Sequence, residues 1–285
     1  MTPEEYCRSK AAPGGSSAYY AFLFLPPERR AAITALHAFC REIMDVVDEC
    51  ADPALARTKL GWWRTEVHRM FADDAGKADH PVICALKPHL ARYDLDEKPM
   101  HEIIDGAEMD LNQNRYLDFI ALKRYCRFAA GAVGVLSARI FGATAPKTLR
   151  YAETLGLALQ LIRILRNIGG DARKGRIYLP IDELQRFGVP AAYLLNPRES
   201  GKPGAEFKAL MKFQADRARA VYEEALALLP AADRRAQRPG LILAAIQHAL
   251  LGEIEREDFQ VLHQRISLTP LRKFWIAWRT WVGTR

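Results

Sequence analysis

Two segments place charged and polar residues at helical spacing within otherwise apolar sequence. The first, residues 37–49, reads HAFCREIMDVVDE. One stripe of it, with steps of four, three and four residues, consists of His37, Arg41, Met44 and Asp48, with Asp45 on its flank. Burying such charge costs free energy unless the charge is paired or binds a metal. The segment therefore indicates a buried charged site, or alternatively an exposed acidic helix end in which Arg41 and Asp45 form an ion pair.

The second segment, residues 160–180, reads QLIRILRNIGGDARKGRIYLP. Its polar stripe, with steps of three, four and four residues, consists of Gln160, Arg163, Asn167 and Asp171, and a basic turn follows. Mg²⁺ prefers oxygen ligands, usually a few carboxylates and substrate phosphates, and arginines bind phosphate oxygens. Two helices that present acids toward each other beside arginines would form a diphosphate site. An ordinary basic helix end would explain the Arg/Lys run but not Gln160 and Asp171 on one face.

Composition narrows the class of partner. The chain has 41 Lys and Arg against 34 Asp and Glu, a net charge of +7, which suits an anionic membrane surface or a phosphorylated metabolite. No nucleic acid is expected, because zinc-knuckle spacing, a basic arm and an aromatic RNA-binding signature are missing from the sequence. The five cysteines form no C-x-x-C pair, and no apolar run approaches the ~20 residues of a spanning helix. We expect a cytoplasmic protein, at most peripheral at the inner membrane surface.

Apolar residues recur at 3.6-residue spacing along most of the chain. A helix beginning at Pro26-Pro27 is followed by helical stretches at 54–72, 81–93, 98–112, 118–141, 146–169, 205–229 and 239–264. Breaks are expected at 73–76, Gly142, Gly169-Gly170 and a mobile loop at 196–204. Since no alternating run suits a sheet, the sequence predicts a single all-α domain over residues 1–285.

Several motifs together resemble the squalene/phytoene synthase family, specifically its bacterial presqualene diphosphate synthase branch. They are SSAYYAFLFLPP from Ser16, AFCREIMDVVDE from Ala38, DGAEMDL from Asp105, GVLSARIFG from Gly134 and GRIYLP from Gly175. The resemblance implies an all-α isoprenoid-synthase helical bundle with a central cavity. It also implies a farnesyl-diphosphate farnesyltransferase-like prenyl transferase of squalene and hopanoid biosynthesis. That enzyme condenses two farnesyl diphosphates head to head into presqualene diphosphate, with Mg²⁺ as cofactor and release of diphosphate.

The resemblance also implies roles for individual residues. Catalytic roles fall to Tyr125 and Arg166. The prenyl diphosphate would be bound by Ser17, Arg41, Gln160, Arg163, Arg176 and Tyr178. The metal ligands would be Asp45, Asp48, Asn167 and Asp171.

The sequence departs from the family pattern where the chemistry is expected. In place of D-D-x-x-D stands Met44-Asp-Val-Val-Asp48, and the second motif carries Arg163, Asn167 and Gly170 where ligands or acids are usual. Three carboxylates remain where the pattern has six, and a thioether is a poor Mg²⁺ ligand. The altered pocket positions are Ala18, His37, Met44, Gly170 and Gln247. The alternative function is a catalytically weakened or repurposed member, natural or engineered, that binds a prenyl diphosphate or another apolar ligand without the native reaction.

The C-terminal segment 271–285 is basic and holds three of the five tryptophans. Trp275, Trp278 and Val282 share a helix face, with Arg272, Lys273 and Arg279 interspersed. Such a helix could lie on an anionic bilayer. Alternatively, it could dock its tryptophans onto the protein body.

Overall fold

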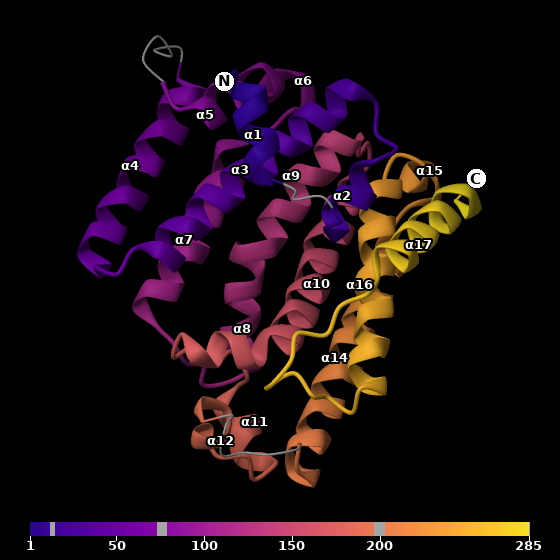
Figure 1. Cartoon of the computed structure of the whole chain (residues 1–285). Helices are drawn as coiled ribbons and strands as arrows, with labels where there is room; N and C mark the ends of the chain where they lie inside the picture. Colours follow the sequence, from indigo (N-terminus) through magenta and orange to yellow (C-terminus); the bar gives the residue numbers. More distant parts are fainter. Residues whose placement is uncertain (12–14, 73–78, 197–202, 285) are drawn as a thin grey trace.

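The computed structural model describes residues 1–11, 15–72, 79–196 and 203–284. These residues fold into helices and connecting turns, and their only β-type pairing is an isolated bridge between Arg115 and Ile177. The all-α expectation is confirmed. Figure 1 shows long helices side by side, with the C-terminal helix on one outer flank.

Helix α10 (Pro146–Arg173) runs through the middle of the bundle. It packs against α14 (Ala205–Leu228), α16 (Arg238–Arg256), α9 (Ala132–Phe141) and the π-helical turn η3 (Arg127–Gly131). Apolar side chains cover most of its circumference, as expected of a buried helix. Gly156 permits the close approach of η3, because a Cβ there would lie 2.5 Å from the Ala130 carbonyl oxygen.

Helix α3 (Pro27–Glu49) carries the first polar stripe and organises the N-terminal half. It begins at a proline, whose missing N–H costs nothing in the first turn. Its apolar stripe of Ile33, Leu36, Phe39, Ile43 and Val47 is buried. Around it lie α1 (Pro3–Ala11), α5 (Pro81–Leu86), α7 (Glu97–Asn112) and α9.

The remaining elements are shorter or peripheral. They are α2 (Ser17–Phe22), α4 (Pro53–Phe71), η2 (Lys87–His89), α6 (Leu90–Tyr93), α8 (Phe119–Cys126), α11 (Ile181–Arg186), α12 (Ala191–Leu195), α15 (Ala231–Arg234) and α17 (Pro270–Gly283). In the described residues no helix is both long and apolar enough to cross a membrane.

Two predicted boundaries are wrong. The break at Gly169-Gly170 does not occur, since α10 continues to Arg173. Gly169 serves packing instead, because a Cβ there would lie 2.3 Å from the Leu262 carbonyl oxygen. The stretch predicted at 239–264 ends early: α16 stops at Arg256, and Asp258 and Phe259 both have a φ of 57°. Residues 73–76 and most of the 196–204 loop lie outside the described residues.

Candidate functional site

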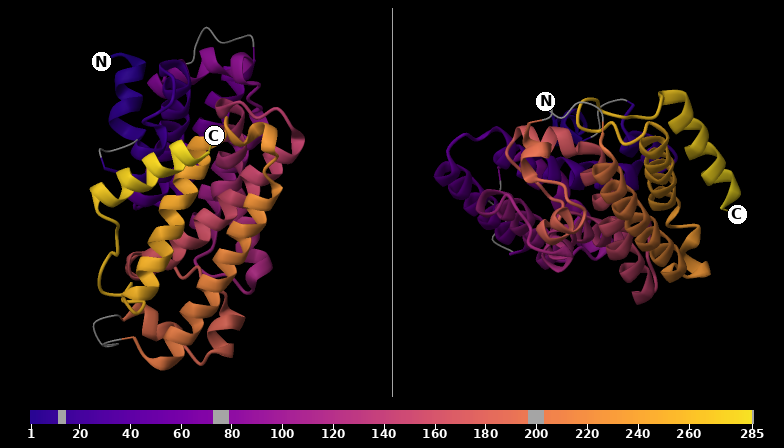
Figure 2. Two further views of the ribbon diagram at one scale, coloured as in Figure 1. Left: turned by 90° about the vertical axis from the view of Figure 1, so that its right-hand side faces the viewer. Right: turned by 90° about the horizontal axis from the view of Figure 1, so that it is seen from below.

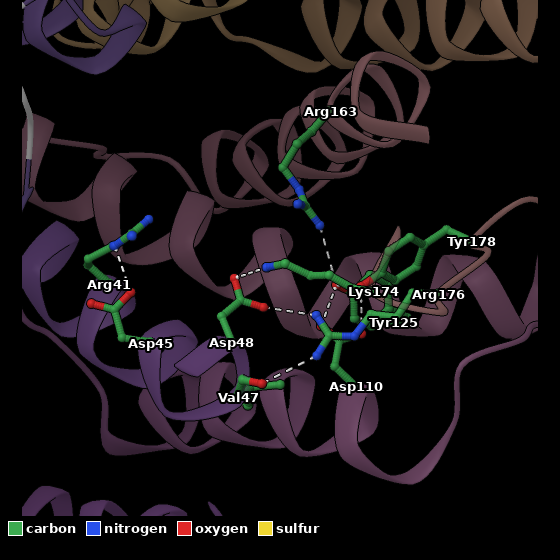
Figure 3. A network of polar contacts seen from close by, with 10 residues as sticks. All are labelled: Arg41, Asp45, Val47, Asp48, Asp110, Tyr125, Arg163, Lys174, Arg176 and Tyr178. Carbon is green, nitrogen blue, oxygen red and sulfur yellow. Dashed lines mark hydrogen bonds and ion pairs between the residues drawn. The ribbon is translucent and has the colours of Figure 1, made fainter. Parts of the chain in front are cut away.

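Figure 3 shows acids of the first stripe and Arg163 of the second near the chain segment that leaves α10, which carries Lys174, Arg176 and Tyr178. Two hydrogen bonds, one between backbone groups and one from a side chain, join this segment to the residues that follow α7. The Ile177 N–H donates to the Asn114 carbonyl at 3.0 Å, and Arg115 Nη1 donates to the Gly175 carbonyl at 2.7 Å. These hydrogen bonds place Arg176 next to Asp48 of α3 and Tyr178 next to the buried Asp110.

A buried carboxylate, Asp110 on α7, joins two of the predicted residues. Its Oδ2 accepts the Tyr125 hydroxyl at 3.1 Å, and its Oδ1 accepts the Tyr178 hydroxyl at 2.8 Å. The two tyrosine rings stack with centroids 5.1 Å apart. Burial raises the pKa of Asp110, of Tyr125 and of Tyr178, so both phenols remain protonated donors at neutral pH. Asp110 belongs to the quoted DGAEMDL motif, but no site role was predicted for it.

Arg163 projects from α10 toward this group. Its Nε donates to Gln160 Oε1 at 2.9 Å, and its Nη2 lies 3.4 Å from the Tyr125 hydroxyl. Burial alone would lower the pKa of Arg163, but the oxygens of Tyr125, Tyr178 and nearby carboxylates raise it. A permanent cation therefore stands at the centre of the second stripe.

The acids of the first stripe are held by basic side chains. Asp45 lies 2.8 Å from Arg41 Nε and 3.4 Å from Lys10 Nζ. Asp48 lies 2.9 Å from both Lys174 Nζ and an Arg176 Nη. Although burial opposes the ionisation of Asp48, these two cations lower its pKa. The predicted Arg41–Asp45 ion pair is confirmed, but it forms beside a polar cluster rather than at an isolated helix end.

The second stripe offers few free oxygens. Asn167 Oδ1 accepts a hydrogen bond from Arg166 Nε at 3.1 Å. Asp171 Oδ2 is buried and has no hydrogen-bond partner among the described residues. Burial raises the pKa of Asp171 to about 6, although the neighbouring Arg163, Arg176 and Lys174 lower it. Gly170 leaves open space, since the nearest atom to a Cβ there would be an Arg173 nitrogen at 3.8 Å.

Mg²⁺ does not fit these residues as they stand. Within the described ranges, no group of three or more His, Cys, Asp or Glu side chains could hold a metal ion. Met44 packs half-buried against the apolar core, and Arg163 places a cation beside Asp110 and Asp171. The metal-ligand roles of Asp45, Asp48, Asn167 and Asp171 stay predictions.

A second cationic group, which sequence analysis missed, consists of Arg166, Arg265 and Lys273. Burial, Arg265 and Arg163 lower the pKa of Arg166 to about 10. Burial, Arg166 and Arg265 lower the pKa of Lys273, whose Nζ donates to the Gly15 carbonyl at 2.8 Å. In the described part of the chain, none of the three forms an ion pair. Three segments distant in sequence meet here, so no local pattern could reveal the group.

An apolar cavity of about 260 Å³ adjoins the same two helices. His37 and Cys40 of α3 precede the first acids, and Leu155 and Leu159 of α10 precede Gln160. Burial lowers the pKa of His37 to about 4, and its ring meets Phe22 edge-on with centroids 5.0 Å apart. His37 is therefore a neutral wall residue. Other lining residues are Ala129, Val133, Gly134, Phe141, Gly156 and Leu243.

Three predicted residues are not joined to the polar cluster. Among the described residues, Ser17, Ala18 and Gln247 make no hydrogen bond to it. Ser17 opens α2, while the neighbouring Ser16 caps that helix by accepting the Tyr19 N–H at 3.1 Å. Ala18 packs half-buried against the core. The roles of Ser17 and of the altered positions Ala18 and Gln247 stay predictions.

The structure thus combines an all-α bundle, an apolar cavity and a cluster of arginines, acids and tyrosines. Residues 11–272 match the squalene/phytoene synthase family, and the chain belongs to that family. The family condenses prenyl diphosphates head to head and generally uses a divalent metal.

The relatives are named phytoene synthase. One from Mycobacterium tuberculosis is 38% identical over 259 residues, which cover 91% of this chain and 84% of the relative. One from Arthrospira platensis is 34% identical over 282 residues, covering 94% of this chain and 89% of the relative. They support the family assignment but not the narrower presqualene diphosphate synthase branch.

Solved structures share the fold. A dehydrosqualene synthase in complex with a ligand aligns with a TM-score of 0.85 at 24% identity, covering 99% of this chain and 96% of that one. Squalene synthase HpnC from Alicyclobacillus acidocaldarius aligns with a TM-score of 0.77 at 27% identity, covering 90% of this chain and 94% of that one. The predicted isoprenoid-synthase fold is confirmed.

Proposed function

We propose that this chain binds a prenyl diphosphate and holds the anionic headgroup with guanidinium and ammonium groups rather than with Mg²⁺. The observation that carries this proposal is the unneutralised group of Arg166, Arg265 and Lys273. Burial, and then repulsion from the neighbouring cations, depress the pKa of Arg166 and that of Lys273. A bound diphosphate would relieve that repulsion, whereas a divalent cation would add to it.

The other basic residues are placed to assist. Arg163 and Arg166 are three residues apart on α10, so their positively charged side chains start from neighbouring positions on the helix surface. Arginine offers forked N–H donors that match phosphate oxygens. The prenyl chain would occupy the apolar cavity, where its burial supplies binding free energy. His37 lines that cavity as a neutral ring.

Arg41 and Arg176 belong to the headgroup set in a different way. Each already pairs with a carboxylate, Asp45 and Asp48 respectively. A diphosphate would have to compete with those acids for the two guanidinium groups. We therefore assign Arg41 and Arg176 a weaker share of the binding than Arg166, Arg265 and Lys273.

Head-to-head condensation is the second candidate function, and the Asp110 group favours it. In that reaction the allylic C–O bond breaks and its electron pair leaves with diphosphate. The second prenyl double bond attacks the allylic cation, and the resulting cation loses a proton as the cyclopropane ring closes. Arg163 and Arg166 would stabilise the departing diphosphate. Tyr125 would stand beside the cation in its catalytic role, held by Asp110. The substrates would be two farnesyl diphosphates by motif resemblance, while the relatives named phytoene synthase favour a phytoene-forming reaction.

The two candidates are separated by product analysis. Purified protein is incubated with C15 and C20 prenyl diphosphates and excess Mg²⁺, and mass spectrometry reads condensed products and released diphosphate. Absence of condensed products, together with calorimetric binding of a farnesyl thiodiphosphate analogue in EDTA, supports the metal-independent binding function. Presqualene diphosphate or phytoene from the unmodified chain would establish condensation and show that three carboxylates suffice.

The binding proposal is tested by substitution. Titration calorimetry with a farnesyl thiodiphosphate analogue compares the unmodified chain with Arg166→Gln, Arg265→Gln and Lys273→Gln. Each should weaken binding by about tenfold or more, because each removes a charge-assisted contact. The matched control is Arg219→Gln on α14, whose half-buried arginine pairs with Glu255 of α16. Equal affinities in all four variants would refute the proposed headgroup site.

A further inference from the structure

Helix α17 is docked firmly by one face. Ala277 is fully buried, and the Trp281 ring stacks on Phe24 with centroids 5.1 Å apart. The Arg238 guanidinium also lies over the Trp281 ring, 4.8 Å from its centroid, and its Nη2 donates to the Thr284 carbonyl at 2.7 Å. The sequence left open whether this segment docks its tryptophans onto the protein body. Of its three tryptophans, only Trp281 does so.

The opposite face of α17 points away from the protein. Leu271 is 83% exposed, Trp275 58% and Trp278 43%. Together with Val282 they follow steps of four, three and four residues, which places them on one stripe of the helix. The Trp275 and Trp278 rings stack on each other with centroids 5.1 Å apart. Figure 2 shows α17 lying across the outside of α16, with its far side uncovered.

Positive charge borders this stripe. The described part of α17 holds Arg272, Lys273 and Arg279 and no acidic residue. Arg272 pairs with Glu253 of α16, and Lys273 bonds the Gly15 carbonyl. Arg279 is exposed. The surface thus combines tryptophans and aliphatic side chains with basic groups, which is the pattern of a helix that lies in the headgroup region of a bilayer.

We propose that the outer face of α17, defined by Leu271, Trp275, Trp278 and Val282, docks onto an anionic lipid bilayer. Tryptophan and arginine favour the boundary between acyl chains and anionic headgroups. The net charge of +7, from 41 Lys and Arg against 34 Asp and Glu, adds a long-range electrostatic attraction to such a surface.

The docked helix also connects the bilayer to the candidate site. Lys273 belongs to α17 and to the cationic group with Arg166 and Arg265. A prenyl diphosphate is an amphiphile whose chain partitions into lipid. Membrane docking would bring such a ligand to the protein from the lipid phase. This last step rests on the proposed function, whereas the docking itself does not.

Vesicle co-sedimentation tests the docking directly. Phosphatidylcholine vesicles, with and without phosphatidylglycerol, are mixed with the unmodified chain and with the double variant Trp275→Ser, Trp278→Ser. We expect binding to the anionic vesicles, and a loss of about tenfold or more in the double variant, because two interfacial rings are removed. Arg279→Glu should weaken binding to the anionic vesicles only. The matched control is Trp62→Ser, a residue that is 45% exposed on α4. Helix α4 lies on the opposite flank of the bundle from α17 (Figure 1).

Several outcomes would overturn the proposal. Unchanged vesicle binding in the double variant would exclude this face, and equal binding to neutral vesicles would exclude recognition of anionic lipid. A concentration-dependent dimer that the double variant abolishes, with no vesicle binding, would identify a second copy as the occupant. Because Trp275 and Trp278 face solvent, the double variant should keep the thermal unfolding midpoint of the unmodified chain. It should also bind the soluble thiodiphosphate analogue normally, so the two proposals can fail independently.

Discussion

Replacing Asp171 by asparagine should stabilise the protein. The buried Asp171 carboxylate has an oxygen without a hydrogen-bond partner among the described residues, and its pKa is raised from 3.8 to about 6. A raised carboxyl pKa means that the folded state binds the proton more tightly than the unfolded chain. The ionised form therefore lowers the free energy of unfolding at neutral pH, by at most about 3 kcal/mol. An amide of the same shape removes that charge.

The effect has a defined pH dependence. Above pH 6 the destabilisation by ionised Asp171 is fully present, and it diminishes as pH falls from about 6 toward 3.8. Thermal unfolding followed by circular dichroism should show Asp171→Asn melting above the unmodified chain at pH 8, by roughly 2–6 °C. The gap should shrink to roughly half at pH 5. A lower midpoint for the variant at pH 8, or a gap independent of pH, would refute this reasoning.

Asp233 supplies the matched control, with the opposite sign. Although burial opposes ionisation, hydrogen bonds from Thr144 and Thr148 lower the pKa of Asp233 to about 2. A depressed pKa means stability that is present above pH 3.8 and is lost as pH falls through about 2. Asp233→Asn should therefore lower the unfolding midpoint throughout pH 5 to 8.

Two further predictions concern the buried cluster. Tyr125→Phe removes one of the two tyrosine donors to Asp110 and should cost about 1–3 kcal/mol in urea unfolding. Tyr151→Phe should leave the free energy of unfolding nearly unchanged, because the buried Tyr151 hydroxyl has no partner among the described residues. An equal loss of stability in both variants would contradict a stabilising Tyr125–Asp110 hydrogen bond. The triple variant Met44→Asp, Arg163→Asn, Asn167→Asp restores the acids of the family pattern. In calorimetry it should bind the thiodiphosphate analogue in a Mg²⁺-dependent way. Binding that does not depend on Mg²⁺ would show that the missing carboxylates are not the reason why Mg²⁺ does not fit the site.

Helices with a strict apolar period were predictable from the sequence. The predicted stretches 54–72 and 205–229 correspond to α4 and α14 within one residue at each end, since each buries a regular apolar face. The predicted break at Gly169-Gly170 was wrong because glycine can permit close packing inside a helix as well as end a helix. The single-domain organisation of residues 1–285 stays a prediction.

The candidate site was predictable only where its residues share a helix. Gln160 and Arg163 are three residues apart on α10, and their hydrogen bond follows from helix geometry. The Asp48–Arg176 pair joins α3 to the segment after α10. Arg265 reaches Arg166 from the non-helical stretch after α16. Such contacts depend on which distant segments pack together in the fold, and the spacing of residues within one segment does not predict that packing.

The central claim is that basic side chains hold the diphosphate headgroup without a metal. Calorimetric titration of the farnesyl thiodiphosphate analogue, in excess EDTA and then in excess Mg²⁺, tests it most directly. We predict dissociation constants that agree within about threefold, a difference below roughly 1 kcal/mol. Binding that disappears in EDTA and returns with Mg²⁺ would contradict the account. It would mean that Asp45 and Asp48 exchange their basic partners for metal when the ligand binds, and that Asp171 joins them as a ligand.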